Sequence, residues 1–116
     1  MPAYNFKSRF AQKVENGEKR QTLRPRRKRP TIPGDILFLY TGMRTKRARL
    51  LCRDSCKSVT PVIIEERGII YNGNRLTVLE QIEFAKRDGF DSLYEFRDFF
   101  YQQYGGLPVE LEMIQW

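Results

Sequence analysis

Two helix-capping boxes in the second half of the chain constrain its fold most. Thr77 is followed three positions later by Glu80, and Ser92 three positions later by Glu95. In such a box the hydroxyl accepts a hydrogen bond from the backbone N–H of the acidic residue, whose own side chain bonds back to the first residue. We therefore predict two consecutive helices, each beginning just after its Thr or Ser.

Glycines mark the ends of both predicted helices, the first near Gly89 and the second near residues 105–106. Apolar residues at three- and four-residue spacing indicate which sides of the helices face the core. The inward residues predicted for the first helix are Leu79, Ile82 and Ala85, and those for the second are Leu93, Phe96, Phe99 and Phe100. We interpret this aromatic stripe as core rather than as a binding platform.

The remaining chain favours short strands, preceded by one helix over 8–16 that closes at Gly17. Strands are predicted over 34–42, 48–53 and 59–65, in a hairpin around Asn72-Gly73-Asn74, and over 109–113. Helices are inserted between the strands without strict alternation. We therefore predict one α+β domain over 1–116, with a largely antiparallel, barrel-like β-sheet and flanking helices.

The net charge of +7 is concentrated in one segment. Seven of the 21 Lys and Arg residues fall between positions 19 and 29, where no acidic residue occurs, and the other 14 balance the 14 Asp and Glu. Pro25 and Pro30 bound the densest part and disfavour helix, which predicts a semi-rigid exposed loop at about 24–31. Such a local positive potential is typical of a site for phosphates or another anionic partner, and a solvated charge run without a dedicated partner is the alternative.

The chain has no histidine and two cysteines, Cys52 and Cys56. This excludes Ser-His-Asp and Cys-His catalysis and leaves a metal site at the cysteines incomplete, so we expect no metal, no cofactor and two partly buried apolar thiols. No apolar run approaches the roughly 18 residues of a membrane span, and the start lacks a signal peptide. We expect a soluble, cytoplasmic protein that does not contact a membrane.

A short motif joins the first helix to the next predicted strand. Period-two geometry places Thr22 and Arg24 on one face of that strand, with Lys19 at the turn beside them. Gly17, Lys19, Thr22 and Arg24 match the G-x-K-x-x-[E/T]-x-R signature of the ASCH domains, which belong to the PUA-like superfamily. The chain resembles this family, in particular its small stand-alone members from bacteria and phages.

Other segments resemble the ASCH plan in the same order along nearly the whole chain. They are the Pro-Gly-Asp-Ile at 33–36, the Phe84-Ala85-x-x-Asp88-Gly89-Phe90 segment, the Phe-rich helix and the terminal Ile-Gln-Trp. The resemblance implies a small β-barrel with helices beside it. It also implies a cleft, lined by the signature Lys and Arg, that binds RNA or a modified nucleoside.

We carry three functional hypotheses. The first is binding of RNA or another single-stranded nucleic acid, because unstacked bases can enter such a cleft. The residues predicted to contact nucleic acid are Lys19, Arg20, Arg24, Arg26, Arg27, Lys28 and Arg29, with a second group at Arg44, Lys46, Arg47 and Arg49 that would lie beside the loop if the strands pair as expected.

The second hypothesis is an enzyme, since some small ASCH proteins deacetylate N4-acetylcytidine. The resemblance implies that Lys19 takes the proton from the Thr22 hydroxyl, which attacks the acetyl carbonyl while Arg24 steadies the developing charge. The acidic residue of the family corresponds to Asp88 within a residue or two, and is a Glu in most members. The structural alternatives are that Thr22 is an ordinary strand residue and that Asp88 only ends a helix.

The third hypothesis is a module for an acidic protein partner. The basic loop would bind this partner while the Trp116 terminus docks elsewhere.

Overall fold

The computed structural model describes residues 2–116, which form three helices and eight strands. The helices are α1 (Ser8–Glu15), α2 (Val78–Arg87) and α3 (Leu93–Tyr104). The strands are β1 (Ala3–Phe6), β2 (Gln21–Arg24), β3 (Ile36–Thr41), β4 (Arg49–Ser55), β5 (Ser58–Glu65), β6 (Gly68–Tyr71), β7 (Asn74–Arg75) and β8 (Val109–Gln115).

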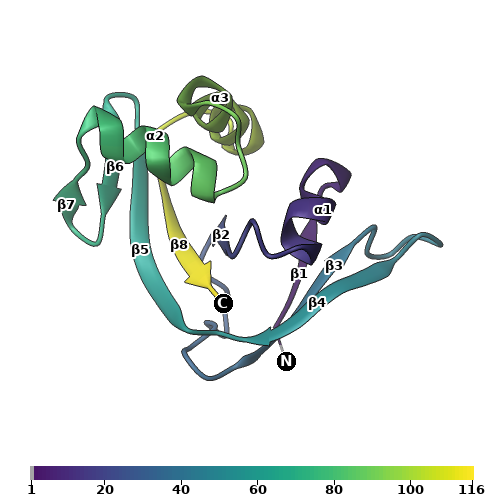
Figure 1. The fold of residues 1–116 in the computed structure, drawn as a ribbon. Helices are drawn as coiled ribbons and strands as arrows, with labels where there is room; N and C mark the ends of the chain where they lie inside the picture. Colours follow the sequence, from purple (N-terminus) through teal and green to yellow (C-terminus); the bar gives the residue numbers. More distant parts are fainter. Residues whose placement is uncertain (1) are drawn as a thin grey trace.

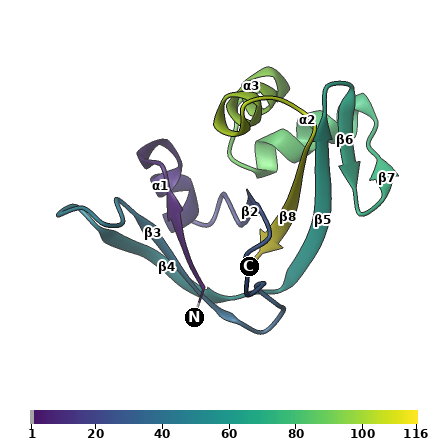
Figure 2. The same cartoon turned by 180° about the vertical axis from the view of Figure 1, so that it is seen from behind.

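The strands form two sheets. One has the order β1-β3-β4 and the other β2-β8-β5-β6-β7, and all pairings are antiparallel except that of β1 with β3. Figures 1 and 2 show the sheets meeting where β4 runs into β5 and opening away from that bend. Helix α1 lies over the smaller sheet, whereas α2 and α3 lie at the far end of the larger one, so that α1 and α3 face each other across β2.

One hydrophobic core connects the two sheets with the helices. It contains Tyr4 and Phe6 of β1, Leu23 of β2 and the fully buried Phe96 of α3. Aromatic rings fill the space between α1 and α3, where Phe90 contacts other phenylalanines in edge-to-face geometry. Each such pair contributes about 0.5–1.5 kcal/mol beyond the area that it buries. The stripe interpreted from the sequence as core is confirmed for Phe96 and Phe100, while Leu93 and Phe99 are only partly buried.

Local signals in the sequence located the helix ends and the hairpin correctly. Helix α1 ends before Gly17, whose φ of 84° is the left-handed conformation that glycine adopts without strain. The capping box of Thr77 and Glu80 is complete in both directions, and the Ser92 hydroxyl accepts from the Glu95 N–H. Strands β6 and β7 pair through a two-residue Asn-Gly turn in which both residues have positive φ.

The α+β class and the mostly antiparallel pairing are confirmed, but the predicted barrel is wrong. Within residues 2–116 no strand pairing joins the three-stranded sheet to the five-stranded one. A side chain bridges the gap between the edge strands instead, because Arg24 Nη2 of β2 donates to the backbone oxygen of Asn5 in β1 at 2.6 Å. The two sheets are therefore not closed into a barrel.

The predicted inward face of α2 is partly wrong. Ala85 is fully buried and Ile82 half-buried, but Leu79 is 79% exposed. The buried stripe runs through Gln81, Phe84 and Ala85. At about 100° per residue, Leu79 lies roughly opposite Gln81 on the helix. None of the helices in the described part of the chain combines the length and the apolar character needed to span a bilayer.

Candidate functional site

Strand β2 carries the signature residues into the space between the sheets. Gly17 turns the chain out of α1, and Lys19 then enters the protein interior, where its side chain is only 4% exposed. Thr22 and Arg24 lie on one face of β2, as predicted. Their side chains are in contact there, since Arg24 Nε donates a hydrogen bond to Thr22 Oγ1 at 2.9 Å. This bond holds the Arg24 guanidinium along the strand, and the Thr22 hydroxyl oxygen is its acceptor.

The Lys19 ammonium is paired with the Asp88 carboxylate. Lys19 Nζ lies 3.3 Å from Asp88 Oδ1 and also donates to the Asp88 backbone oxygen. Gln21 Nε2 donates to the same carboxylate oxygen at 3.3 Å. The structure thus brings Lys19 together with the acidic residue that the resemblance indicated, and Asp88 is at the same time the C-cap of α2.

Gly89 makes the approach of Lys19 sterically feasible. Its φ is 98°, and a Cβ placed there would lie 3.0 Å from Lys19 Cδ and 3.0 Å from Phe10 Cδ1. A side chain at this position would therefore press against both pocket residues in a backbone conformation that other amino acids rarely adopt.

Burial opposes both charges of the pair. Desolvation lowers the pKa of Lys19, and the neighbouring Asp88 carboxylate partly offsets this effect. Desolvation likewise raises the pKa of Asp88, against the attraction of Lys19 and the hydrogen bond from Gln21. The pKa of Arg24 is lowered by burial as well, although a guanidinium remains protonated in proteins. The site therefore holds Lys19 and Arg24 as poorly solvated cations. Beside them lies Asp88, whose carboxyl group releases its proton less readily than a solvent-exposed one.

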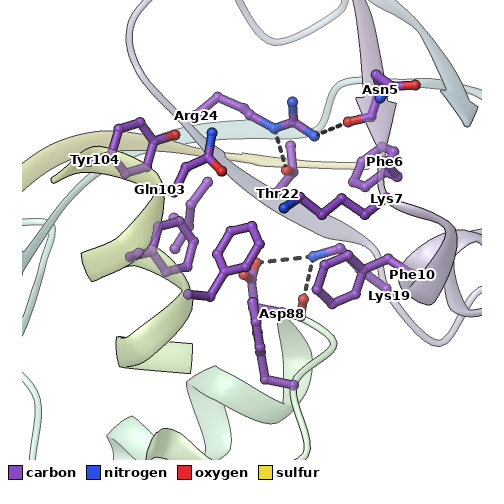
Figure 3. Close-up of a pocket in the computed structure, with 14 residues that line it drawn as sticks. Asn5, Phe6, Lys7, Phe10, Lys19, Thr22, Arg24, Asp88, Gln103 and Tyr104 are labelled. Carbon is purple, nitrogen blue, oxygen red and sulfur yellow. Dashed lines mark hydrogen bonds and ion pairs between the residues drawn. The ribbon is translucent and has the colours of Figure 1, made fainter. Parts of the chain in front are cut away.

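Lys19, Thr22, Arg24 and Asp88 line one pocket of about 240 Å³ between β2, α1 and α3 (Figure 3). Figure 3 shows Arg24, Thr22 and Lys19 along one side, Asp88 at the base, and Gln103 and Tyr104 on the α3 side. The remaining lining residues are Asn5, Phe6, Lys7, Phe10, Leu23, Phe90, Phe99 and Phe100. The pocket thus combines aromatic walls with a small number of cationic and hydrogen-bonding groups.

Cations stack on aromatic rings around this pocket. The Arg24 guanidinium lies 5.1 Å from the Phe6 ring centroid, and the Lys19 ammonium lies 5.2 Å from that of Phe10. The Arg27 guanidinium lies 4.1 Å from the Tyr4 ring. These contacts, each contributing from about 0.5 kcal/mol to about 2 kcal/mol when desolvated, orient the cations without neutralising them.

The basic loop of residues 25–31 begins where Arg24 ends β2. Arg26, Lys28 and Arg29 are exposed, and no ion pair to any of them occurs within the described residues. Arg27 differs, because its guanidinium donates to the Ala3 backbone oxygen while it stacks on Tyr4. The loop therefore has three free cations and one that is anchored to β1.

The other predicted contact residues lie apart from the loop. Arg20 Nε donates to the Trp116 backbone oxygen at 3.0 Å, and its guanidinium pairs with Asp54 at 3.1 Å, outside the pocket lining. In the second predicted group, Arg44, Lys46 and Arg47 are exposed at the tip between β3 and β4, while Arg49 at the start of β4 pairs with Glu15 at 2.6 Å. The loop leads into the start of β3 whereas this tip follows its end, so the expected side-by-side arrangement of the two basic groups is wrong (Figure 1).

Several pocket residues escaped the sequence reasoning. Gln103 and Tyr104 belong to no motif, and Asn5 and Lys7 lie outside the signature. Gln21 does not line the pocket but contacts its base through the hydrogen bond to Asp88, and no sequence signal pointed to that bond. The aromatic residues Phe99 and Phe100 were recognised as core, but they also form part of the pocket wall.

Comparisons with protein families, with curated proteins and with solved structures give no match to this chain. Within residues 2–116, no group of three or more His, Cys, Asp or Glu side chains is arranged to hold a metal ion. The geometry and the charges of the pocket, and of the surfaces next to it, are therefore the features that bear on function.

Proposed function

We propose that the protein binds single-stranded RNA and takes one unstacked nucleotide into the pocket between β2, α1 and α3. The observation that carries this proposal is the presence, in one pocket, of aromatic walls and of the cations Lys19 and Arg24. A planar base needs π-faces for stacking, and the phosphate attached to it needs positive charge.

The size of the pocket supports a single base or nucleoside as its occupant. Its volume of about 240 Å³ is below the roughly 300–1,000 Å³ that is usual for pockets of drug-sized ligands. Gln103 and Asp88 supply amide and carboxylate groups for the edge of a base. A base paired within a duplex cannot reach such groups, which favours single strands and loops over double helices.

The basic loop supports binding of the flanking backbone. Arg24 belongs to the pocket, and the exposed Arg26, Lys28 and Arg29 follow it directly in the chain. Because these three cations have no acidic partner within the described residues, phosphates need not displace an existing ion pair. Release of condensed counterions from the RNA then contributes to the affinity.

Kinship with the ASCH domains of the PUA-like superfamily is part of the same proposal. Lys19, Thr22 and Arg24 of the signature all line the pocket, and Gly17 ends the helix before them. The open arrangement of the two sheets departs from the closed barrel that the resemblance implied. The proposed kinship is thus supported by the residues of the site and not by the arrangement of the sheets.

The test is the salt dependence of RNA binding, measured by fluorescence anisotropy with a labelled single-stranded RNA oligomer. We expect the triple variant Arg26→Ala/Lys28→Ala/Arg29→Ala to bind more weakly. The slope of log affinity against log salt should become shallower by about 2, because each lost contact to a single strand removes about 0.7. Arg27 is left in place because its stacking on Tyr4 supports β1.

A control variant removes the same charge elsewhere. Lys57, Arg67 and Lys86 are exposed and do not line the pocket. Their replacement by alanine should leave the slope and the affinity close to wild type. Equal effects of the two triple variants would indicate attraction by net charge alone, and no measurable RNA binding by the wild type would leave an acidic protein partner as the better interpretation of the loop.

Amide hydrolysis is the second candidate, and the environment of Lys19 favours it. Burial lowers the pKa of Lys19, which increases the share of neutral amine able to take a proton, and the Thr22 hydroxyl lines the same pocket. Thr22 Oγ would bond to the acyl carbon, its proton would pass to Lys19 and then to the leaving amine, and water would release the acid. We place this second because the hydrogen bond of Lys19 is to Asp88 rather than to Thr22.

Turnover of N4-acetylcytidine, followed by chromatographic detection of cytidine, separates the two candidates. Thr22→Ala should abolish turnover and Thr22→Ser should retain part of it, while Thr22→Ala should still bind RNA, because the cations of the pocket and of the loop remain. No turnover by the folded wild-type protein would remove this candidate and leave the binding proposal intact.

A further inference from the structure

A second hollow, formed by α1 and α3, adjoins the pocket. It has a volume of about 470 Å³ and is lined by residues of α1 and α3, including Tyr94 and Asp98. Lys7, Phe99 and Gln103 line both the pocket and this hollow. The two spaces are therefore neighbours, with these three residues at their boundary.

The hollow presents an aromatic ring to solvent. Tyr94 is 78% exposed, although an aromatic side chain of this size is usually buried for most of its surface. Tyr94, Asp98 and Gln102 follow one another at four-residue spacing and so lie along one face of α3. The face consists of an exposed ring, a carboxylate and an amide, which are the groups that stack on a base and bond to its edge.

The charges in the hollow favour a base over a phosphate. Glu95 is paired with Arg9 at 3.7 Å, so these two charges offset each other. Asp98 has no ion pair within residues 2–116. Its carboxylate would repel a phosphate, but it can accept a hydrogen bond from the exocyclic amino group of cytosine, adenine or guanine.

Lys7 supplies positive charge at the boundary between the two spaces. Its ammonium lies 5.0 Å from the ring centroid of Phe99, the residue whose ring borders both. In Figure 3 the Lys7 side chain extends over the pocket from the β1 side, opposite Gln103 on α3. A phosphate that links one base in the pocket to another in the hollow would pass this ammonium.

From this arrangement we infer that the protein has a second nucleotide subsite, in which the neighbouring base stacks on Tyr94, its amino group bonds to Asp98, and Lys7 binds the linking phosphate. This inference rests on the proposed function, because it extends the RNA chain from the pocket. It makes the ligand a segment of at least two nucleotides and gives the second position a preference for an amino-bearing base over uracil.

The experiment compares nucleoside 5′-monophosphates with the matching dinucleoside monophosphates by isothermal titration calorimetry. We expect the wild type to bind dinucleotides more tightly than mononucleotides. Tyr94→Ala should weaken dinucleotide binding about 5- to 150-fold, the range corresponding to loss of one base–aromatic stack, and should leave mononucleotide binding within about twofold. Asp98→Asn should reduce the preference for an amino-bearing base over uracil at the second position.

Tyr101→Ala is the matched control, because Tyr101 is also an exposed tyrosine of α3 but lines neither space. It should leave both kinds of binding unchanged. Equal affinities of the wild type for mono- and dinucleotides, or an equal loss in the Tyr94 and Tyr101 variants, would overturn the second subsite while the proposed function stands. Absence of binding to mononucleotides, dinucleotides and RNA alike would overturn both.

Discussion

At the scale of single residues, the pair of Lys19 and Asp88 determines the character of the pocket. Both side chains are almost fully withdrawn from solvent, and their charged atoms lie 3.3 Å apart. A buried ion pair of this kind adds little to stability relative to apolar residues, but removal of one partner leaves an uncompensated charge in the interior. Each of the two residues is therefore needed mainly because the other is present.

The first prediction concerns Asp88→Asn. The variant should lose about 3–5 kcal/mol of unfolding free energy at pH 7, measured by urea denaturation, since Lys19 would be buried without its counter-charge. Burial already lowers the pKa of Lys19, and loss of the carboxylate lowers it further. Between this folded pKa and the higher unfolded pKa the unfolded state binds more protons, so stability rises with pH.

The pH dependence provides the check on this interpretation. The stability deficit of Asp88→Asn relative to wild type should narrow between pH 7 and pH 10. The raised pKa of Asp88 adds a separate effect, since wild-type stability falls as pH rises from the ordinary carboxyl pKa to the raised one. The double variant Lys19→Met/Asp88→Leu should be more stable than Asp88→Asn. A deficit independent of pH, or a double variant with simply additive losses, would contradict a coupled charge pair.

At the scale of secondary-structure elements, α2 and α3 differ in the contacts that hold them in the fold. Helix α2 begins at a complete capping box and buries the stripe of Gln81, Phe84 and Ala85. Helix α3 inserts Phe96 and Phe100 into the core and also presents a face to the pocket and the hollow. The apolar character of a residue therefore does not by itself predict burial, because Leu79 is apolar and yet exposed.

The second prediction compares two large apolar residues of these helices. Leu79→Ala should change the unfolding free energy by less than about 0.5 kcal/mol, because that side chain is 79% exposed. Phe96→Ala should cost about 3–5 kcal/mol, because Phe96 is fully buried and its removal leaves a cavity. Urea denaturation followed by circular dichroism measures both. A loss above about 2 kcal/mol for Leu79→Ala would mean that α2 packs through a different face.

At the scale of the whole molecule, the two sheets share one core although no strand pairing joins them in the part of the chain described. Trp116 at the end of the larger sheet packs edge-to-face on Phe6 of the smaller one, with centroids 5.9 Å apart. Arg20 adds a second tie, because it bonds to the Trp116 backbone oxygen and to Asp54 of β4. The sheets should therefore unfold as one unit.

The third prediction uses Trp116, the single tryptophan, which is 2% exposed. Its fluorescence reports on the junction of the sheets, whereas far-ultraviolet circular dichroism reports on all helices and strands. The two signals should give coincident urea transitions with one midpoint, as expected of a two-state domain of this size. An earlier fluorescence transition would show that the sheets separate before the rest of the chain unfolds.

Local signals were sufficient for much of the architecture. The capping box at Thr77, the glycine after α1 and the Asn-Gly turn each depend on a few neighbouring residues, and the structure agrees with all three. The same holds for Thr22 and Arg24, whose shared face follows from the two-residue period of a strand. These elements were predictable because their causes lie within a few positions along the chain.

The pairing of Lys19 with Asp88, residues far apart in the sequence, needed the resemblance to suggest it and the fold to bring the side chains together. The open sheets, the solvent-facing Leu79 and the hollow beside Tyr94 had no local signal at all. The α+β class, the helix ends and the position of the charge follow from the amino-acid sequence alone. Which distant side chains share a pocket, and whether the sheets close, is visible only in the folded protein, because both depend on packing between elements rather than on local conformation.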